Sequence, residues 1–246
     1  FVTDLKYIDT NLANGIYSNL ESGQYLPINL KSYVTIEGES KTNTILDGNN
    51  RYPAMYGWSS EQGMKVRNFT IRNCISPHDG QTAIVECISR LQNSDNVTNR
   101  FSLELENLRF YNCQPVYLDD VFFVIYLVYP DRLVLRNIDI EECRGDVAIN
   151  LIGSNITAEN IRVHRFRYGP GVGENCGTGM AISTDYRHGG RPNYFTNLEF
   201  TNCENEQTDW ATSAILQIGG YESTTDETEN YFINCTIADN YCRPVY

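Results

Sequence analysis

A short phrase that begins with asparagine recurs along the chain and constrains its fold more than any other feature. Its copies begin at Asn68, Asn107, Asn137, Asn160, Asn197 and Asn234. In every copy the first and third residues after the asparagine are apolar, whereas the second and fourth are mostly polar, as in NIDIEEC from Asn137. This alternation has a period of two, which is the period of a β-strand with one buried face. Each copy therefore predicts one half-buried strand.

The spacing of the copies indicates how these strands are connected. Successive asparagines are separated by 39, 30, 23, 37 and 37 residues. Unequal spacing excludes rigid helical repeats but fits a solenoid whose strands are fixed while its loops vary. A second recurring segment, marked by Ala-Ile, begins at Ala83, Ala148, Ala181 and Ala214, and FFVIYLV at 122–128 takes its place in one further copy. We therefore predict at least two strands in each turn, with YVTIEGE at 33–39 as an earlier relative of the asparagine phrase.

The phrase N-Φ-x-Φ-x-x-C, in which Φ is apolar, and the segment LKSYVTIEGESKTNTILDG at 30–48 resemble the right-handed parallel β-helix proteins of the pectate-lyase-like superfamily. The segment is similar to the first coil of bacterial surface β-helix repeats. The resemblance covers roughly residues 25 to 242 and implies an all-β fold, a single-stranded right-handed parallel β-helix of about seven coils. It leaves 1–24 as an N-terminal cap or an incomplete first turn. Because nothing in the composition marks a linker, we predict a single domain over residues 1–246.

Stacking of such coils brings identical positions about 4.8 Å apart and aligns the asparagines and cysteines into two ladders. Asparagine can both donate and accept along a stack, and it tolerates the left-handed backbone of a tight turn. Cysteine stands six residues after the asparagine at Cys74, Cys113, Cys143 and Cys203. A disulfide needs converging Cβ atoms about 3.8 Å apart, so we predict free, buried thiols in this ladder. A loop bridge through Cys176 or Cys242 stays open.

The composition narrows the partners and the location. A formal net charge of -12 and a pI near 4.7 argue against nucleic acid and anionic membranes as partners, because both require a broad basic surface. No apolar run approaches the roughly 20 residues that span a bilayer, so no membrane insertion is predicted. Four N-x-S/T sequons and 17 tyrosines favour an extracellular or cell-surface location. The first residue is Phe1 rather than methionine, from which we expect either a removed leader or an excised domain.

Known enzymes of this superfamily bind an extended polysaccharide along an outward strand face, so the resemblance makes the outward positions the candidate site. In the three central copies these positions are Arg109 and Tyr111, Asp139 and Glu141, and Arg162 and His164. Asp139 and Glu141 should lie about 7 Å apart, within the roughly 6.5 to 9.5 Å that separates the carboxyl groups of inverting glycosidases. We therefore predict Asp139, Glu141 and His164 as catalytic residues. The arginines and Tyr111 are predicted to bind substrate.

The same outward positions also have a purely structural interpretation. Down one column Arg109, Asp139, Arg162 and Glu199 alternate in sign. Alternation alone gives favourable cross-strand pairs of about 0.2 to 1 kcal/mol each, without any ligand.

A second concentration of basic residues lies between 162 and 191 in an otherwise acidic chain. Its predicted substrate-binding members, besides Arg162, are Asp185, Arg187, His188 and Arg191. Arginine presents a planar fork to carboxylate or sulfate, so this region predicts contact with an acidic polysaccharide. The segment STDYRHGGRP at 183–192 holds an Asp/His pair suited to acid-base chemistry, and a solvated loop is the alternative.

These patterns predict a secreted or surface carbohydrate-interacting protein that binds or cleaves an acidic polysaccharide, as a hydrolase or lyase if it is an enzyme. The alternative is a non-catalytic structural or adhesive surface module. No C-x-x-C pair is present, so neither a metal site nor a cofactor is predicted, and calcium stays possible without an identified ligand set. The chain ends in CRPVY without an obvious cap, so we expect an open strand edge covered by a further domain, a partner or self-association.

Overall fold

The structure is a computed structural model that describes residues 10–12, 15–18, 27–58, 61–76, 83–89, 100–115, 122–168, 178–184, 191–205, 214–220 and 228–242. These residues form β-strands and no helix. Every pairing among the described strands is parallel. The predicted all-β class is therefore confirmed. No helix that could span a membrane occurs in this part of the chain.

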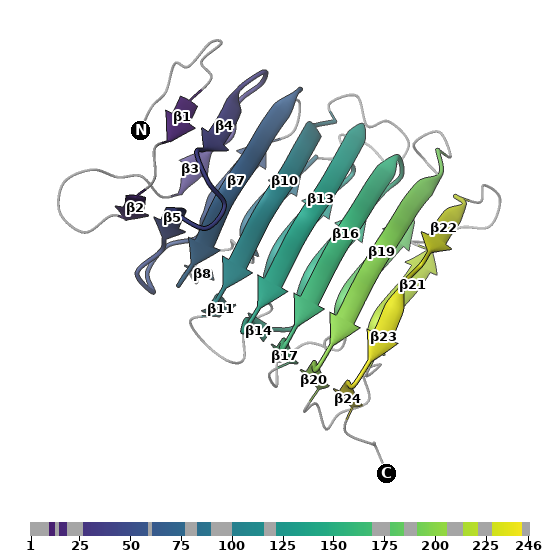
Figure 1. The fold of residues 1–246 in the computed structure, drawn as a ribbon. Helices are drawn as coiled ribbons and strands as arrows, with labels where there is room; N and C mark the ends of the chain where they lie inside the picture. The colour runs from purple at the N-terminus through teal and green to yellow at the C-terminus, as the bar shows by residue number, and fades with distance from the viewer. Residues whose placement is uncertain are drawn as a thin grey trace.

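The largest sheet, called the long sheet below, has eleven strands and faces the viewer in Figure 1. Its main path runs through β1 (Thr10–Leu12), β4 (Thr35–Gly38), β7 (Met64–Arg72), β10 (Ser102–Tyr111), β13 (Arg132–Glu141), β16 (Ile156–His164), β19 (Asn193–Thr201) and β22 (Asn230–Ile233). The shorter strands β2 (Gly15–Ser18), β5 (Thr44–Asp47) and β23 (Thr236–Ala238) complete it.

The remaining strands form a second sheet and two corner sheets. The second sheet consists of β3 (Ile28–Asn29), β6 (Met55–Trp58), β9 (Ala83–Ile88), β12 (Phe123–Val128), β15 (Val147–Ile152), β18 (Thr178–Thr184) and β21 (Ala214–Gly220). The corner sheets consist of β8 (Ile75–Ser76) with β11 (Gln114–Pro115), and of β14 (Arg144–Gly145), β17 (Arg167–Tyr168), β20 (Glu204–Asn205) and β24 (Tyr241–Cys242). From β7 onward the chain visits the long sheet, a corner sheet and the second sheet in the same order each time. This cyclic order is compatible with a parallel β-helix.

Side chains between the sheets form one apolar core, and the period-two alternation explains which residues enter it. The first and third residues after the asparagine are at most 1% exposed in the five copies from Asn68 to Asn197. In the last copy Cys235 is exposed and Ile237 is 51% exposed, because β22 and β23 form the last step of the long sheet among the described residues. The burial of these positions is thus confirmed for five copies, whereas in the sixth Ile237 keeps the register of the buried Phe200 but is not covered by a further described strand.

The asparagines divide each long strand into two halves. All six have positive φ, between 53° and 66°, a conformation that asparagine adopts more readily than most residues. Their side chains are linked by Nδ2-to-Oδ1 hydrogen bonds of 2.7 to 2.9 Å, from Asn107 to Asn68, Asn160 to Asn137, Asn197 to Asn160 and Asn234 to Asn197. We call the strand residues before the asparagine the upper half of the long sheet and those after it the lower half, as they lie in Figure 1.

The cysteines that follow the asparagines point into the core. Cys74, Cys113, Cys143 and Cys203 are buried and free, as predicted. Burial, reinforced by the neighbouring Cys113, raises the pKa of the Cys74 and Cys143 thiols, which keeps them protonated. The bridge left open for Cys176 or Cys242 lies outside the side chains that the structure describes.

Next to β7, two short strands, β4 and β5, take the place of the single long strand found in the later copies. β4 pairs with the upper half of β7, whereas β5 pairs with the lower half, so that Glu37 lies beside Arg67 and Ile45 beside Thr70. The predicted equivalence of YVTIEGE with the asparagine phrase is therefore wrong, since alternating residues fit either half equally well. Between the two strands, residues 39–43 form an inserted loop in place of a single left-handed residue. Of the predicted cap at 1–24, the structure describes only β1 and β2, which extend the long sheet.

Candidate functional site

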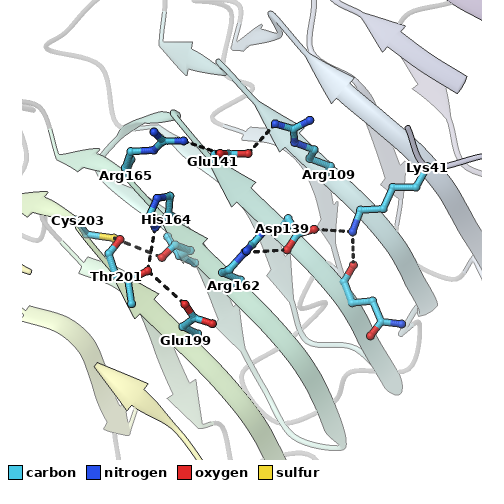
Figure 2. Close-up of polar contacts among 12 residues, drawn as sticks. Lys41, Arg109, Asp139, Glu141, Arg162, His164, Arg165, Glu199, Thr201 and Cys203 are labelled. Atoms are coloured by element: carbon cyan, nitrogen blue, oxygen red, sulfur yellow. Dashed lines mark hydrogen bonds and ion pairs between the residues drawn. The ribbon is translucent and has the colours of Figure 1, made fainter. Parts of the chain in front are cut away.

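The lower half of the long sheet brings six predicted site residues onto adjacent strands. In one outward column Arg109, Asp139, Arg162 and Glu199 are register partners, and in the next Tyr111, Glu141, His164 and Thr201. These columns alternate with the buried positions because the lower half of each strand keeps a period of two. Figure 2 shows how the polar side chains of this face lie.

Asp139 lies between two cations. Its Oδ2 accepts a hydrogen bond from Lys41 Nζ at 2.6 Å, and its Oδ1 lies 3.2 Å from Arg162 Nε (Figure 2). Lys41 stands 98 residues earlier in the chain and also donates to the Asn137 carbonyl at 3.3 Å. Charge-assisted hydrogen bonds of this kind are shorter and stronger than neutral ones. Asp139 is therefore held from the inserted loop on one side and from β16 on the other.

Glu141 is held in the same way by two arginines. Arg109 Nη2 donates to Oε2 and Arg165 Nη2 to Oε1, each at 2.6 Å (Figure 2). Partial burial raises the pKa of Glu141, but the hydrogen bonds and charges of the two arginines outweigh it, so the pKa lies below its ordinary value. A general acid that protonates a glycosidic oxygen needs a raised pKa. The environment of Glu141 opposes that role.

His164 belongs to a separate chain of hydrogen bonds. Its Nδ1 lies 2.9 Å from Thr201 Oγ1, and that hydroxyl donates to Glu199 Oε1 at 3.4 Å. The tautomer of the ring decides which of the two groups donates in the first of these contacts. His164 is thus oriented toward β19, away from the carboxylates predicted to share its chemistry.

Two cations of this site were not predicted. Lys41 is positioned by its loop, where Thr70 Oγ1 donates to the Lys41 carbonyl at 2.6 Å and Thr44 N donates to the Ser40 carbonyl at 2.8 Å. Arg165 belongs to the basic region that the sequence marks for contact with a polyanion, but it is not among the residues predicted to bind substrate. Its signal was available, because Arg165 occupies a turn position that is asparagine in three other copies.

The predicted residues beyond His164 do not join this site. Asp185, Arg187 and His188 lie outside the described residues. Arg191 is exposed and precedes β19, so it lies at the upper end of the long sheet, where its carbonyl accepts a hydrogen bond from Asn155 N at 3.4 Å. The chain re-enters the long sheet at its upper end, which separates Arg191 from the lower half although the two are close in sequence.

The carboxylates of this face lie deeper than the arginines that bind them. The side chains of Asp139 and Glu141 are 24% and 18% exposed, whereas those of Arg109, Arg162 and Arg165 are 38%, 50% and 48% exposed. Each of these arginines is therefore more exposed than the carboxylate that it binds, and its guanidinium group has N–H donors beyond those bonded to that carboxylate. We call Lys41, Arg109, Tyr111, Asp139, Glu141, Arg162, His164 and Arg165 the lower patch.

An aromatic ring adjoins these cations, and the described residues offer no metal site beside them. Tyr111 is 37% exposed, and the Arg109 guanidinium carbon lies 5.0 Å from its ring centroid, a cation–π distance. Within the described parts of the chain, no group of three or more His, Cys, Asp or Glu side chains is placed to hold a metal ion. The lower patch is suited to contact an anion and a ring face.

No known protein family, curated protein or solved structure matches this chain. The class of protein therefore follows from the fold, an all-β protein of stacked parallel sheets that is compatible with a parallel β-helix.

Proposed function

We propose that this chain is a right-handed parallel β-helix of about seven coils, held by asparagine and cysteine ladders and related to the pectate-lyase-like superfamily. On this proposal it is an extracellular or cell-surface protein that binds an acidic polysaccharide through the lower patch and does not cleave it. The observation that carries the proposal is that the side chains of Arg109, Arg162 and Arg165 are more exposed than the carboxylates to which they bond.

The higher exposure of the arginines favours anion binding, because the partly buried carboxylates of Asp139 and Glu141 hold the guanidinium groups in place. Arg109 and Arg165 each use only part of their donor set on Glu141, so other N–H groups remain for a ligand carboxylate or sulfate. Preorganised side chains lose less conformational entropy when a ligand binds. The face is also locally neutral in a chain of net charge -12, with four carboxylates (Asp139, Glu141, Glu142 and Glu199) against its four cations. A polyanion therefore meets less repulsion here than elsewhere on the protein.

The electrostatics of the acidic pair favour binding over cleavage. Hydrolysis by two carboxyl groups requires one of them to be protonated near neutral pH. The arginines instead lower the pKa of Glu141, and Asp139 is bonded to two cations. Glu141 is therefore better suited to fix cations than to exchange a proton near neutral pH.

A second candidate is a structural or adhesive module that binds no glycan. Its support is that the lysine and all three arginines of the lower patch already have a carboxylate partner within 3.2 Å. On this account the pairs only stabilise neighbouring coils.

The test is to titrate the protein with polygalacturonate, alginate and heparin, with dextran as the neutral control. Arg109→Gln should weaken binding of at least one polyanion by about tenfold or more, because one charge-assisted hydrogen bond is lost. Arg136→Gln is the matched control, since Arg136 is 39% exposed against 38% for Arg109 and pairs with Glu159 in the upper half. This control should stay within about twofold of the wild type.

Two outcomes would overturn the proposal. If the protein binds none of the polyanions, the proposal is wrong and the structural or adhesive module is favoured instead. New reducing ends, or the absorbance of unsaturated uronate, would show that the protein is an enzyme.

A further inference from the structure

A second column of left-handed residues stands at the turn between each long strand and its corner strand. Its members are Asn73, Asn112, Glu142, Arg165, Asn202 and Asp239, with φ between 50° and 56°. Asparagine and aspartate suit this conformation, because their short polar side chains bond locally. Asn112 shows the advantage, since its Nδ2 donates to Asn73 Oδ1 at 2.7 Å. Glu142 and Arg165 are therefore the two strained members of the column.

Glu142 and Arg165 occupy neighbouring positions in this column. Arg165 belongs to the lower patch, and Glu142 adjoins it. Arg165 Nε lies 2.9 Å from Glu142 Oε1, while its Nη2 donates to Glu141. Residues held in sparsely populated backbone conformations concentrate at binding and active sites. The replacement of asparagine by Glu142 and Arg165 therefore indicates that the chemistry of these side chains matters more at this turn than an unstrained backbone.

Two arginines stand side by side immediately beyond this turn. Arg144 of β14 is the register partner of Arg167 of β17, and like charges directly opposite each other destabilise a sheet. Arg167 Nε has Glu204 Oε2 at 3.6 Å on the next strand. Arg144 makes no ion pair with any described residue, and its Nε is buried without a hydrogen-bond partner among them. A buried guanidinium N–H without an acceptor is costly.

We propose that this corner, formed by Arg144, Arg165 and Arg167, binds one carboxylate or sulfate group of an acidic polysaccharide. The proposal rests on the proposed function, and it extends the ligand from the lower patch around the edge of the long sheet onto the corner sheet. An anion there binds the exposed guanidinium groups of Arg165 and Arg167 and screens the like charges of Arg144 and Arg167 from each other. It also gives the exposed Arg165 a partner beyond its two carboxylates. We call this group the corner subsite.

The test compares Glu142→Asn, Glu142→Asn/Arg165→Asn and Arg144→Gln with the wild type, using polygalacturonate, alginate and heparin as probes. The double variant should raise Tm by about 2 to 4 °C, because asparagine relieves the strain at both positions. It should also weaken polyanion binding by about tenfold. Glu142→Asn alone keeps Arg165 and should bind at least as well as the wild type. Arg144→Gln should weaken binding with little change in Tm.

The outcomes separate this inference from the function on which it rests. If the wild type binds a polyanion and both the double variant and Arg144→Gln bind it equally well, the corner subsite is wrong and the lower patch stands. If the wild type binds none of the probes, the proposed function fails and the corner subsite with it. A preference for heparin over polygalacturonate that disappears in Arg144→Gln identifies the bound group as sulfate, and the reverse preference identifies carboxylate.

Discussion

The upper and lower halves of the long sheet are built from the same strands and carry the same alternation of charge, yet they pair their charges differently. In the upper half each ion pair joins one acid to one base: Arg67 with Glu37, Lys65 with Glu104 and Arg136 with Glu159. In the lower half Arg72 pairs singly with Asp47, whereas Asp139 and Glu141 each bond to two cations.

The additional cations of the lower half come from outside the alternating columns. Lys41 reaches Asp139 from the inserted loop, and Arg165 reaches Glu141 from a left-handed turn position. Alternation along a sheet therefore accounts for the single pairs but not for the doubled ones. The contrast separates the part of the surface that stabilises the stack from the part that we assign to binding.

The largest effect is expected where the two halves meet. Asn137→Ala should lower the free energy of unfolding by about 2 to 3 kcal/mol, because alanine is strained at a φ of 53° and the acceptor of the Asn160 side chain is lost. Asn137→Gly should cost about 1 kcal/mol, since glycine adopts positive φ freely. Urea unfolding measures both. Equal losses in the two variants would show that the left-handed backbone is not what matters at this boundary.

The next largest effect compares one carboxylate from each half. Glu141→Gln should lower the free energy of unfolding by about 1 kcal/mol, because one of the two oxygens that accept from the arginines becomes an NH2 donor and the remaining hydrogen bond loses its charge on the acceptor. Glu159→Gln removes one exposed partner at 3.6 Å and should cost less than about 0.5 kcal/mol. Urea unfolding at low salt resolves the difference. If Glu159→Gln lowers the free energy of unfolding as much as Glu141→Gln does, bonding of one carboxylate to two cations adds no stability.

The pH dependence of this difference follows from the lowered pKa of Glu141. A carboxyl group whose pKa is lower in the folded state contributes stability above its unfolded pKa and loses it as pH falls through the folded one. The difference in the free energy of unfolding between the wild type and Glu141→Gln should therefore stay constant, at about its full size, from pH 6 to 8. It should shrink as the pH falls below 4.5, the ordinary pKa of a glutamate side chain. Urea unfolding between pH 3 and pH 8 tests this. A gap that widens toward low pH contradicts the pairing.

The smallest effect is expected at the inserted loop. Lys41→Gln should lower the free energy of unfolding by about 0.5 kcal/mol, because Asp139 keeps Arg162 and the loop keeps its own hydrogen bonds. Lys31→Gln is a control, since Lys31 pairs with Glu61 at 3.6 Å away from the lower patch. It should cost less than Lys41→Gln. A larger loss of unfolding free energy in Lys31→Gln would show that the ion pair of Lys41 with Asp139 does not stabilise the protein.

The parts of the structure that could be predicted are those governed by short-range periodicity. The period of two places Ile138 and Ile140 in the core and Asp139 and Glu141 outside, and a left-handed asparagine begins each of the six copies of the phrase. The corner strands were not predicted, because two residues are too few to show a period. The exposure of Ile237 could not be foreseen either, since the local pattern does not reveal whether another strand follows.

The missed residues of the site depend on contacts that are distant in sequence. Nothing near Lys41 indicates that its side chain crosses to a strand 98 residues away. Arg165 could have been identified from the sequence, because an alignment of the turn position that follows each phrase shows arginine there in place of asparagine. The pKa of Glu141 depends on Arg109 and Arg165 together, which no single strand contains.

The most direct test of the account is the affinity of Glu141→Gln for the polyanion that the wild type binds. The amide offers one oxygen acceptor where Arg109 and Arg165 now use two, so one guanidinium group is released for the ligand, and a negative charge that competes with the ligand is removed. The account predicts binding at least about twofold tighter than the wild type, with no product from either protein. Weaker binding by Glu141→Gln, or turnover in the wild type that this variant abolishes, would contradict it.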